Sequence, residues 1–149
     1  MPKLIHNISA PYDTNHLFTL VADIESYPEF LPWCIAARIN NRKKNVILAE
    51  LVIKYKLFRG SYISKVTLIP NKEIIEELVD GPFKKLENHW KFTPTPNGVD
   101  IEFMLDFTLK SKMLNNIVSS EFEHYTNKLI DAFLKRASLS IQPYKIPNS

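Results

Sequence analysis

Apolar and polar residues alternate along the middle of the chain with the two-residue period of β-strands. The clearest run is residues 99–109, where every second residue from Val99 to Leu109 is apolar and the intervening residues are mostly polar. Successive side chains of a strand point to opposite faces of a sheet, so this run predicts a strand with one buried face. The same period predicts strands over residues 47–57, ending on an apolar Leu57, and over residues 86–93. Further strands are expected over residues 4–9, 33–39, 61–69 and 72–79.

Turn signals separate these runs. Gly60, Gly81 and Gly98 all stand in turn-like contexts, and the Asn97-Gly98 pair is typical of a tight β-hairpin. Short turns join strands that are antiparallel neighbours. The sequence therefore predicts a sheet of about seven strands built mainly from consecutive hairpins.

Two segments follow the helical period instead. Residues 14–22 predict a short helix with Asp13 as its N-cap, and residues 112–138 predict one long helix capped by Ser111. The long helix carries an apolar stripe that includes Leu114, Ile117, Val118, Phe122, Tyr125, Leu129, Ala132 and Phe133. We expect an α+β fold in which a curved antiparallel sheet wraps around this helix. Residues 1–141 are expected to form one domain, and residues 142–149 a disordered tail.

Composition narrows the function classes. The chain has 149 residues and a formal net charge of +3, which is too weak to indicate a nucleic-acid partner, and we expect no DNA binding. Cys34 is the only cysteine, so no internal disulfide can form. No apolar stretch approaches the roughly 20 residues of a membrane span, and the first residues do not resemble a signal peptide. A cytoplasmic protein is the simplest expectation.

Signals of catalysis are weak. The sequence offers no glycine-rich phosphate loop, no nucleophile elbow and no His or Cys cluster with metal-ligand spacing, so no metal is expected. The strand acids that the alternation assigns to the outward face are Glu50, Glu102 and Asp106. With no acid or base expected inside the sheet, we predict a protein that is not an enzyme. His89, His124 and Cys34 are interpreted as ordinary surface or core residues rather than ligands or nucleophiles.

Three separated motifs carry a family resemblance. They are YPEFLPWC at residues 27–34, ELVDGPF at 77–83 continuing through LENHW at 86–90, and LIDAFLKRA at 129–137. Together they resemble the coenzyme Q-binding, START-like family. The resemblance implies the helix-grip fold and two roles, namely a ubiquinone-binding lipid chaperone that supports respiratory electron transfer and a bacterial toxin that blocks association of ribosomal subunits. The wider superfamily also contains polyketide cyclases.

The inward-facing residues are candidates for an apolar ligand cavity. Their aromatic and aliphatic side chains either fill the core completely or leave a void that takes an apolar ligand such as ubiquinone. The candidate cavity residues are Trp33, Leu51, Ile53, Tyr55, Phe83, Asn88, Trp90, Phe92, Phe103, Phe107, Phe122, Tyr125 and Phe133. Asn88 either donates to a quinone carbonyl or ties down a neighbouring loop. Tyr27 and Phe30, between the stiffening prolines, are candidates for a gate at the cavity rim.

One predicted hairpin gathers positive charge. Its basic residues are Arg38, Arg42, Lys43 and Lys44. They either meet anionic lipid headgroups at the inner face of the cytoplasmic membrane, or contact a ribosomal subunit, or form a solvated hairpin tip. The tip lacks the aromatic residues that would stack on RNA bases. The leading hypothesis is a non-enzymatic quinone carrier, the alternative is an inhibitor of ribosomal subunit association, and a cyclase-like enzyme comes third.

Overall fold

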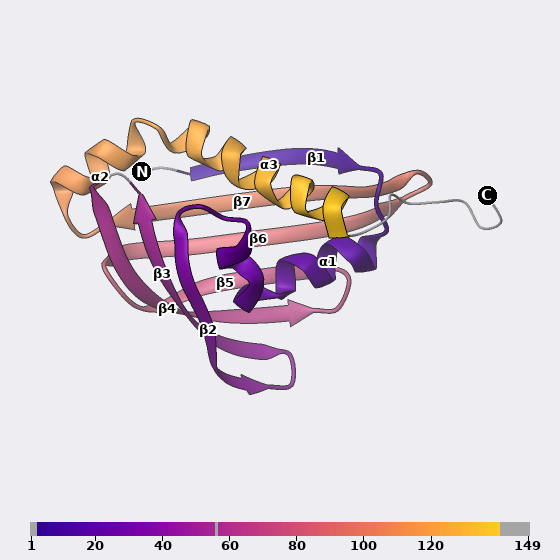
Figure 1. Ribbon diagram of the computed structural model, residues 1–149, viewed down its shortest axis with the longest axis horizontal. Helices are drawn as coiled ribbons and strands as arrows, with labels where there is room; N and C mark the ends of the chain where they lie inside the picture. Colours follow the sequence, from indigo (N-terminus) through magenta and orange to yellow (C-terminus); the bar gives the residue numbers. More distant parts are fainter. Residues whose placement is uncertain (1–2, 56, 141–149) are drawn as a thin grey trace.

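A single antiparallel sheet dominates the computed structural model, which describes residues 3–55 and 57–140 (Figure 1). Its strands are β1 (Lys3–Ala10), β2 (Cys34–Lys43), β3 (Val46–Tyr55), β4 (Phe58–Ile69), β5 (Glu73–Asp80), β6 (Phe83–Thr95) and β7 (Gly98–Leu109). The spatial order is β1-β7-β6-β5-β4-β3-β2. Strands β2 to β7 follow one another as hairpins, and β1 pairs with β7 at the far edge. The predicted meander is confirmed.

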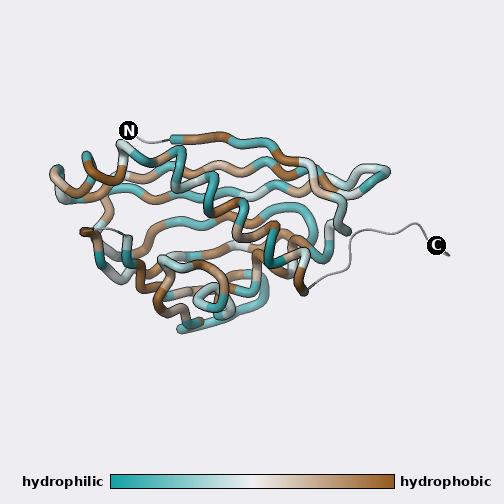
Figure 2. Tube along the Cα trace, turned by 45° about the horizontal axis from the view of Figure 1, so that its top comes forward, coloured by the Kyte–Doolittle hydropathy of each residue, from teal (hydrophilic) through white to brown (hydrophobic). Residues whose placement is uncertain are grey.

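Four helical segments accompany the sheet. They are α1 (Thr14–Ala22), the 3-10 helix η1 (Ile24–Glu29), α2 (Lys112–Ser119) and α3 (Phe122–Ser140). Figure 1 shows α1 and α3 over the same face of the curved sheet, and Figure 2 shows hydrophobic positions recurring along α3 and the strands. This is the α+β helix-grip arrangement that the sequence predicted. The predicted tail, residues 142–149, lies outside the described residues.

The alternating apolar residues of β6 and β7 are buried on one face of the sheet, as predicted. Every second residue from Val99 to Leu109 is buried, and Phe103 has no exposed surface. The register pairs Trp90 with Phe103, so the apolar faces of both strands lie on the same side of the sheet. This shared face, together with α1 and α3, forms the core.

The predicted single helix over residues 112–138 is wrong, because the chain breaks between α2 and α3. Ser120 and Glu121 lie between the two helices. The Ser120 hydroxyl donates to the carbonyl oxygen of Ile117 at 2.8 Å, a local bond that competes with helix propagation. The break allows Val118 and Phe122 to be buried on either side of it. Ser111 caps α2 as predicted, by accepting from the backbone N–H of Leu114.

Three smaller expectations also needed correction. Leu57 is 74% exposed, because β3 ends at Tyr55 and Leu57 lies just before the start of β4 at Phe58. Asp13 precedes α1 as predicted, but its side chain makes no capping hydrogen bond. Asp106 lies on the outward face as predicted yet is only 5% exposed, because its carboxylate pairs with the Lys85 ammonium at 2.8 Å.

Candidate functional site

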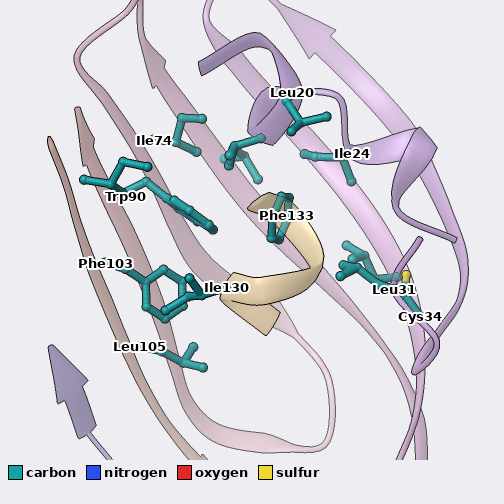
Figure 3. Close-up of a cluster of buried hydrophobic side chains, with 14 of the residues drawn as sticks. Leu20, Ile24, Leu31, Cys34, Ile74, Trp90, Phe103, Leu105, Ile130 and Phe133 are labelled. Carbon is teal, nitrogen blue, oxygen red and sulfur yellow. The ribbon is translucent and has the colours of Figure 1, made fainter. Parts of the chain in front are cut away.

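A cavity of about 140 Å³ lies between the sheet and α3. Residues of β2 to β7, η1, α2 and α3 line it, and nearly all of them are aliphatic or aromatic. Figure 3 shows how the interior is built: Trp90 points inward from the sheet, Leu31 lies across from it, and Phe133 extends from α3 between them. The two-residue period of the strands and the stripe of α3 therefore converge on one apolar space.

Most of the predicted cavity residues reach this space. From the strands these are Leu51, Ile53, Tyr55, Phe83, Asn88, Trp90 and Phe107. Trp33, before β2, and two α3 residues, Tyr125 and Phe133, complete the set, and the predicted rim residue Tyr27 also lines the cavity. Their position is established, and their role in ligand binding stays a prediction.

Three predicted cavity residues are not among those that line it. Phe92 packs against Phe18 of α1, with ring centroids 5.8 Å apart. Phe103 lies behind Trp90 at 4.8 Å, and Phe122 packs on Phe107 at 5.1 Å. All three face the interior, as the alternation required, but they fill the core around the cavity.

An aromatic cluster closes the rim between η1 and α3. The ring of Phe133 meets Tyr27 at 5.3 Å, Phe30 at 5.2 Å and Trp90 at 5.0 Å, each edge to face. Arg136 reinforces the closure. Its guanidinium lies 5.1 Å from the Phe30 ring centre and forms an ion pair with the carboxylate of Glu29 in η1 at 2.7 Å. Phe30 itself borders the rim and does not line the cavity. Opening this side requires α3 and η1 to separate.

The side chain of Asn88 is held by the protein. Its amide nitrogen donates to the carbonyl oxygen of Met104 at 2.8 Å, and its amide oxygen accepts from the indole N–H of Trp90 at 3.0 Å. Of the two interpretations left open by the sequence, these contacts favour an Asn that fixes its neighbours. In particular, it orients the Trp90 ring that forms part of the cavity wall.

The expectation that no acid faces the interior is wrong. Glu76 of β5 lines the cavity. It shares the inward face of its strand with Ile74, which is buried, and Leu78, which packs against the core. Its side chain keeps partial exposure because it borders the cavity. The sequence did not single it out, because the other face of the same strand, Ile75, Glu77 and Val79, shows the same pattern.

Burial sets the protonation of the polar cavity residues. It raises the pKa of Glu76, and the nearby Ser64 hydroxyl offsets only part of that rise. Burial, with a smaller contribution from the Glu76 carboxyl, also raises the pKa values of Tyr27, Tyr62 and Tyr125. The cavity therefore favours uncharged groups.

Cys34, His89 and His124 occupy three different environments. Burial raises the pKa of the Cys34 thiol to about 11, which keeps it protonated at neutral pH. His89 is on the outer face and pairs with Glu73 at 2.6 Å. His124, on α3, is exposed. Within residues 3–55 and 57–140, no group of three or more His, Cys, Asp and Glu side chains could hold a metal ion.

The predicted basic residues lie on the β2–β3 hairpin, which projects from the body of the molecule (Figure 1). Arg38 pairs with Glu50 at 2.9 Å, so part of its charge is balanced. Arg42, Lys43 and Lys44 are exposed towards the tip. No described helix is long and apolar enough to cross a membrane.

Comparison with known proteins agrees with this architecture. Residues 10–134 match the family model described as polyketide cyclase / dehydrase and lipid transport. The chain is 40% identical over 136 residues, 89% of its length, to the ribosome association toxin RatA of Rickettsia prowazekii, of which the match covers 93%. It is 27% identical over 141 residues, 91% of its length, to the mitochondrial coenzyme Q-binding protein COQ10 homolog B of Xenopus laevis, of which the match covers 58%.

A solved structure supports the same relationship. An 18 kDa protein from Caulobacter crescentus superimposes with a TM-score of 0.77 at 30% identity, over 93% of this chain and 97% of its own. The chain belongs to the polyketide cyclase / dehydrase and lipid transport family.

Proposed function

We propose that this protein binds a polyprenyl quinone such as ubiquinone in the cavity beneath α3 and carries it without changing it chemically. The observation that carries the proposal is the space of about 140 Å³ with largely apolar walls. An apolar cavity excludes water and gains free energy when an apolar ligand fills it. The family description includes lipid transport, and one relative is named for binding coenzyme Q.

The volume of the cavity limits how much of the ligand it can hold. A cavity of about 150 Å³ holds one benzene-sized ring. The closed form therefore has room for a bare ring, whereas the ring substituents and the polyprenyl tail of ubiquinone need additional space. Each tail methylene gains about 0.8 kcal/mol when buried, so the tail favours a form in which α3 has moved away from η1. Exchange at the cytoplasmic membrane surface would supply such a form with ligand.

Binding is tested with purified protein from which lipids have been extracted. Ubiquinone with a short tail is titrated into the protein, and quenching of tryptophan fluorescence reports binding because Trp33 and Trp90 line the cavity. Val66→Phe places a ring in the cavity and should abolish binding. Lys65→Phe adds the same ring on the exposed face of β4 and should leave binding unchanged. Equal binding by both variants, or none by the wild-type protein, would contradict the proposal.

A second candidate function is inhibition of ribosomal subunit association. The observation in its favour is the 40% identity to a relative named ribosome association toxin. The exposed β2–β3 hairpin would be the contact surface. Sedimentation of ribosomal subunits with added protein tests this function. The wild-type protein should lower the 70S peak, and the double variant Arg42→Glu/Lys43→Glu should leave the peak at its height without added protein. Val66→Phe should not affect this assay, which separates the two functions.

Glu76 also bears on a cyclase-like activity. The sequence argument against an enzyme was the absence of an inward acid, and Glu76 removes that argument. The aromatase/cyclase from Streptomyces sp. R1128 superimposes with a TM-score of 0.81 over 92% of this chain and 93% of its own, but at 12% identity it shows the fold alone. A carrier remains our proposal, since the described cavity residues include neither a histidine nor a reactive thiol to act beside Glu76.

A further inference from the structure

We propose that Glu76 is the polar anchor of the cavity and that its carboxyl group donates a hydrogen bond to a carbonyl oxygen of the ligand's head group. This inference rests on the proposed function, which requires a ligand that carries an apolar tail and a carbonyl-bearing ring. It assigns the orientation of that ligand, with the head group beside β5. The argument has three parts: the position of Glu76, its lack of a counter-charge, and its protonation.

The position follows from the strand registers. Glu76 of β5 lies opposite Val66 of β4 and Asn88 of β6, both of which line the cavity. Figure 3 shows Ile74 pointing into the interior, and the side chain two residues further along β5 faces the same way. Glu76 thus occupies the sheet wall, across the cavity from α3.

No charge within the described cavity neutralises this acid. The residues that line the cavity include no lysine, arginine or histidine. A polar group that acts on the carboxyl is the hydroxyl of Ser64, which is fully buried. Although it lowers the pKa of the carboxyl, Ser64 Oγ has no partner with hydrogen-bond geometry among the described residues. Even with Ser64 beside it, the Glu76 carboxyl group has two oxygens and therefore leaves hydrogen-bonding capacity for a ligand.

The protonation state of Glu76 determines whether its carboxyl group can donate a hydrogen bond. An ionised carboxylate only accepts hydrogen bonds and would repel a carbonyl oxygen, whereas a neutral carboxyl group carries one O–H donor. Burial shifts Glu76 towards the neutral form. The other titratable groups that line the cavity with Glu76 are four tyrosines and one cysteine. They are Tyr27 of η1, Cys34 of β2, Tyr55 of β3, Tyr62 of β4 and Tyr125 of α3. Burial raises the pKa values of Tyr27, Cys34, Tyr62 and Tyr125, so these groups supply no positive charge to balance an ionised Glu76.

The test compares two substitutions at this position with a neighbouring control. The probe is ubiquinone with two isoprene units, and its dissociation constant is measured by tryptophan quenching. Glu76→Gln keeps a donor and should bind within about threefold of the wild-type protein. Glu76→Leu leaves the ligand carbonyl without a partner and should bind about tenfold more weakly. Glu77→Leu, on the exposed face of the same strand, should bind like the wild-type protein.

The pH profile gives a second readout that a structural role would not move. Wild-type affinity should fall as pH rises through the raised pKa of Glu76, while the affinity of Glu76→Gln should stay constant over roughly pH 5 to 9. Equal or tighter binding by Glu76→Leu, or identical pH profiles for the wild-type protein and Glu76→Gln, would overturn the anchor. Failure of the wild-type protein to bind the probe at any pH would instead overturn the proposed function. The two failures are therefore distinguishable.

Discussion

Phe133 of α3 provides the sharpest test of how the cavity rim is held. Its side chain is 3% exposed and contacts three other rings, all edge to face. Burial of a phenylalanine side chain stabilises a fold by about 1.5–3 kcal/mol, and each aromatic pair adds about 0.5–1.5 kcal/mol. Phe133→Ala should therefore lower the free energy of unfolding by about 3–5 kcal/mol, the range typical of buried phenylalanines.

Two matched variants separate ring contacts from burial. Phe133→Leu retains an apolar side chain and loses the three ring pairs, so we expect a loss of about 1.5 kcal/mol. Leu139→Ala truncates a residue of the same helix that is 77% exposed, and should change stability by less than about 0.5 kcal/mol. Urea titration followed by circular dichroism gives all three values, provided that the dependence on denaturant is unchanged. A loss below about 1 kcal/mol for Phe133→Ala would refute the packing described for the rim.

Four further variants or reactions test other parts of the structure. The pKa of Glu76 is raised in the folded state, so the wild-type protein should lose stability as pH rises from 4.5 towards that raised value. Urea titrations should show that the stability of Glu76→Gln relative to the wild-type protein grows over the same interval. Asn88→Leu strands two buried hydrogen-bond partners and should cost about 2–5 kcal/mol in urea unfolding, whereas a loss under about 1 kcal/mol would leave Asn88 free for a ligand. Gly98→Ala should lower the thermal midpoint far more than Gly60→Ala, because φ is +154° at Gly98 and an added Cβ would lie 2.1 Å from a backbone oxygen. The thiol of Cys34, with its pKa near 11, should react with a disulfide reagent near neutral pH only after unfolding; rapid labelling of folded protein would contradict its burial.

The alternation of apolar residues predicted most of the fold, because a buried strand face depends on sequence period alone. β6 and β7 illustrate this, since their inward faces follow the period over residues 86–92 and 99–109. The break between α2 and α3 could not be predicted in the same way. The apolar stripe continues through it, and the features that accompany the break, the Ser120 hydroxyl bond to Ile117 and the burial of Val118 and Phe122, appear only in the folded structure.

The candidate site shows the limit of the same method. Periodicity gives the face of a strand, but not the depth at which a side chain meets a cavity. Phe103 and Trp90 face the same side, yet Trp90 lines the space and Phe103 lies behind it. Glu76 was missed for a different reason: residues 72–79 were predicted as a strand without assigning its faces. Residues 74–79 carry one acid on each face, Glu76 and Glu77, so either register places an acid inside, but the period does not say which one.

The central claim, that the cavity holds a quinone, is tested most directly by organic extraction of protein purified from cells that make ubiquinone. The account predicts that the wild-type protein carries extractable quinone and that Val66→Phe, whose added ring occupies the cavity, carries none, while Lys65→Phe matches the wild-type protein. Wild-type protein that carries no quinone, and that takes up none when lipid-free protein is mixed with ubiquinone in vesicles, would contradict it.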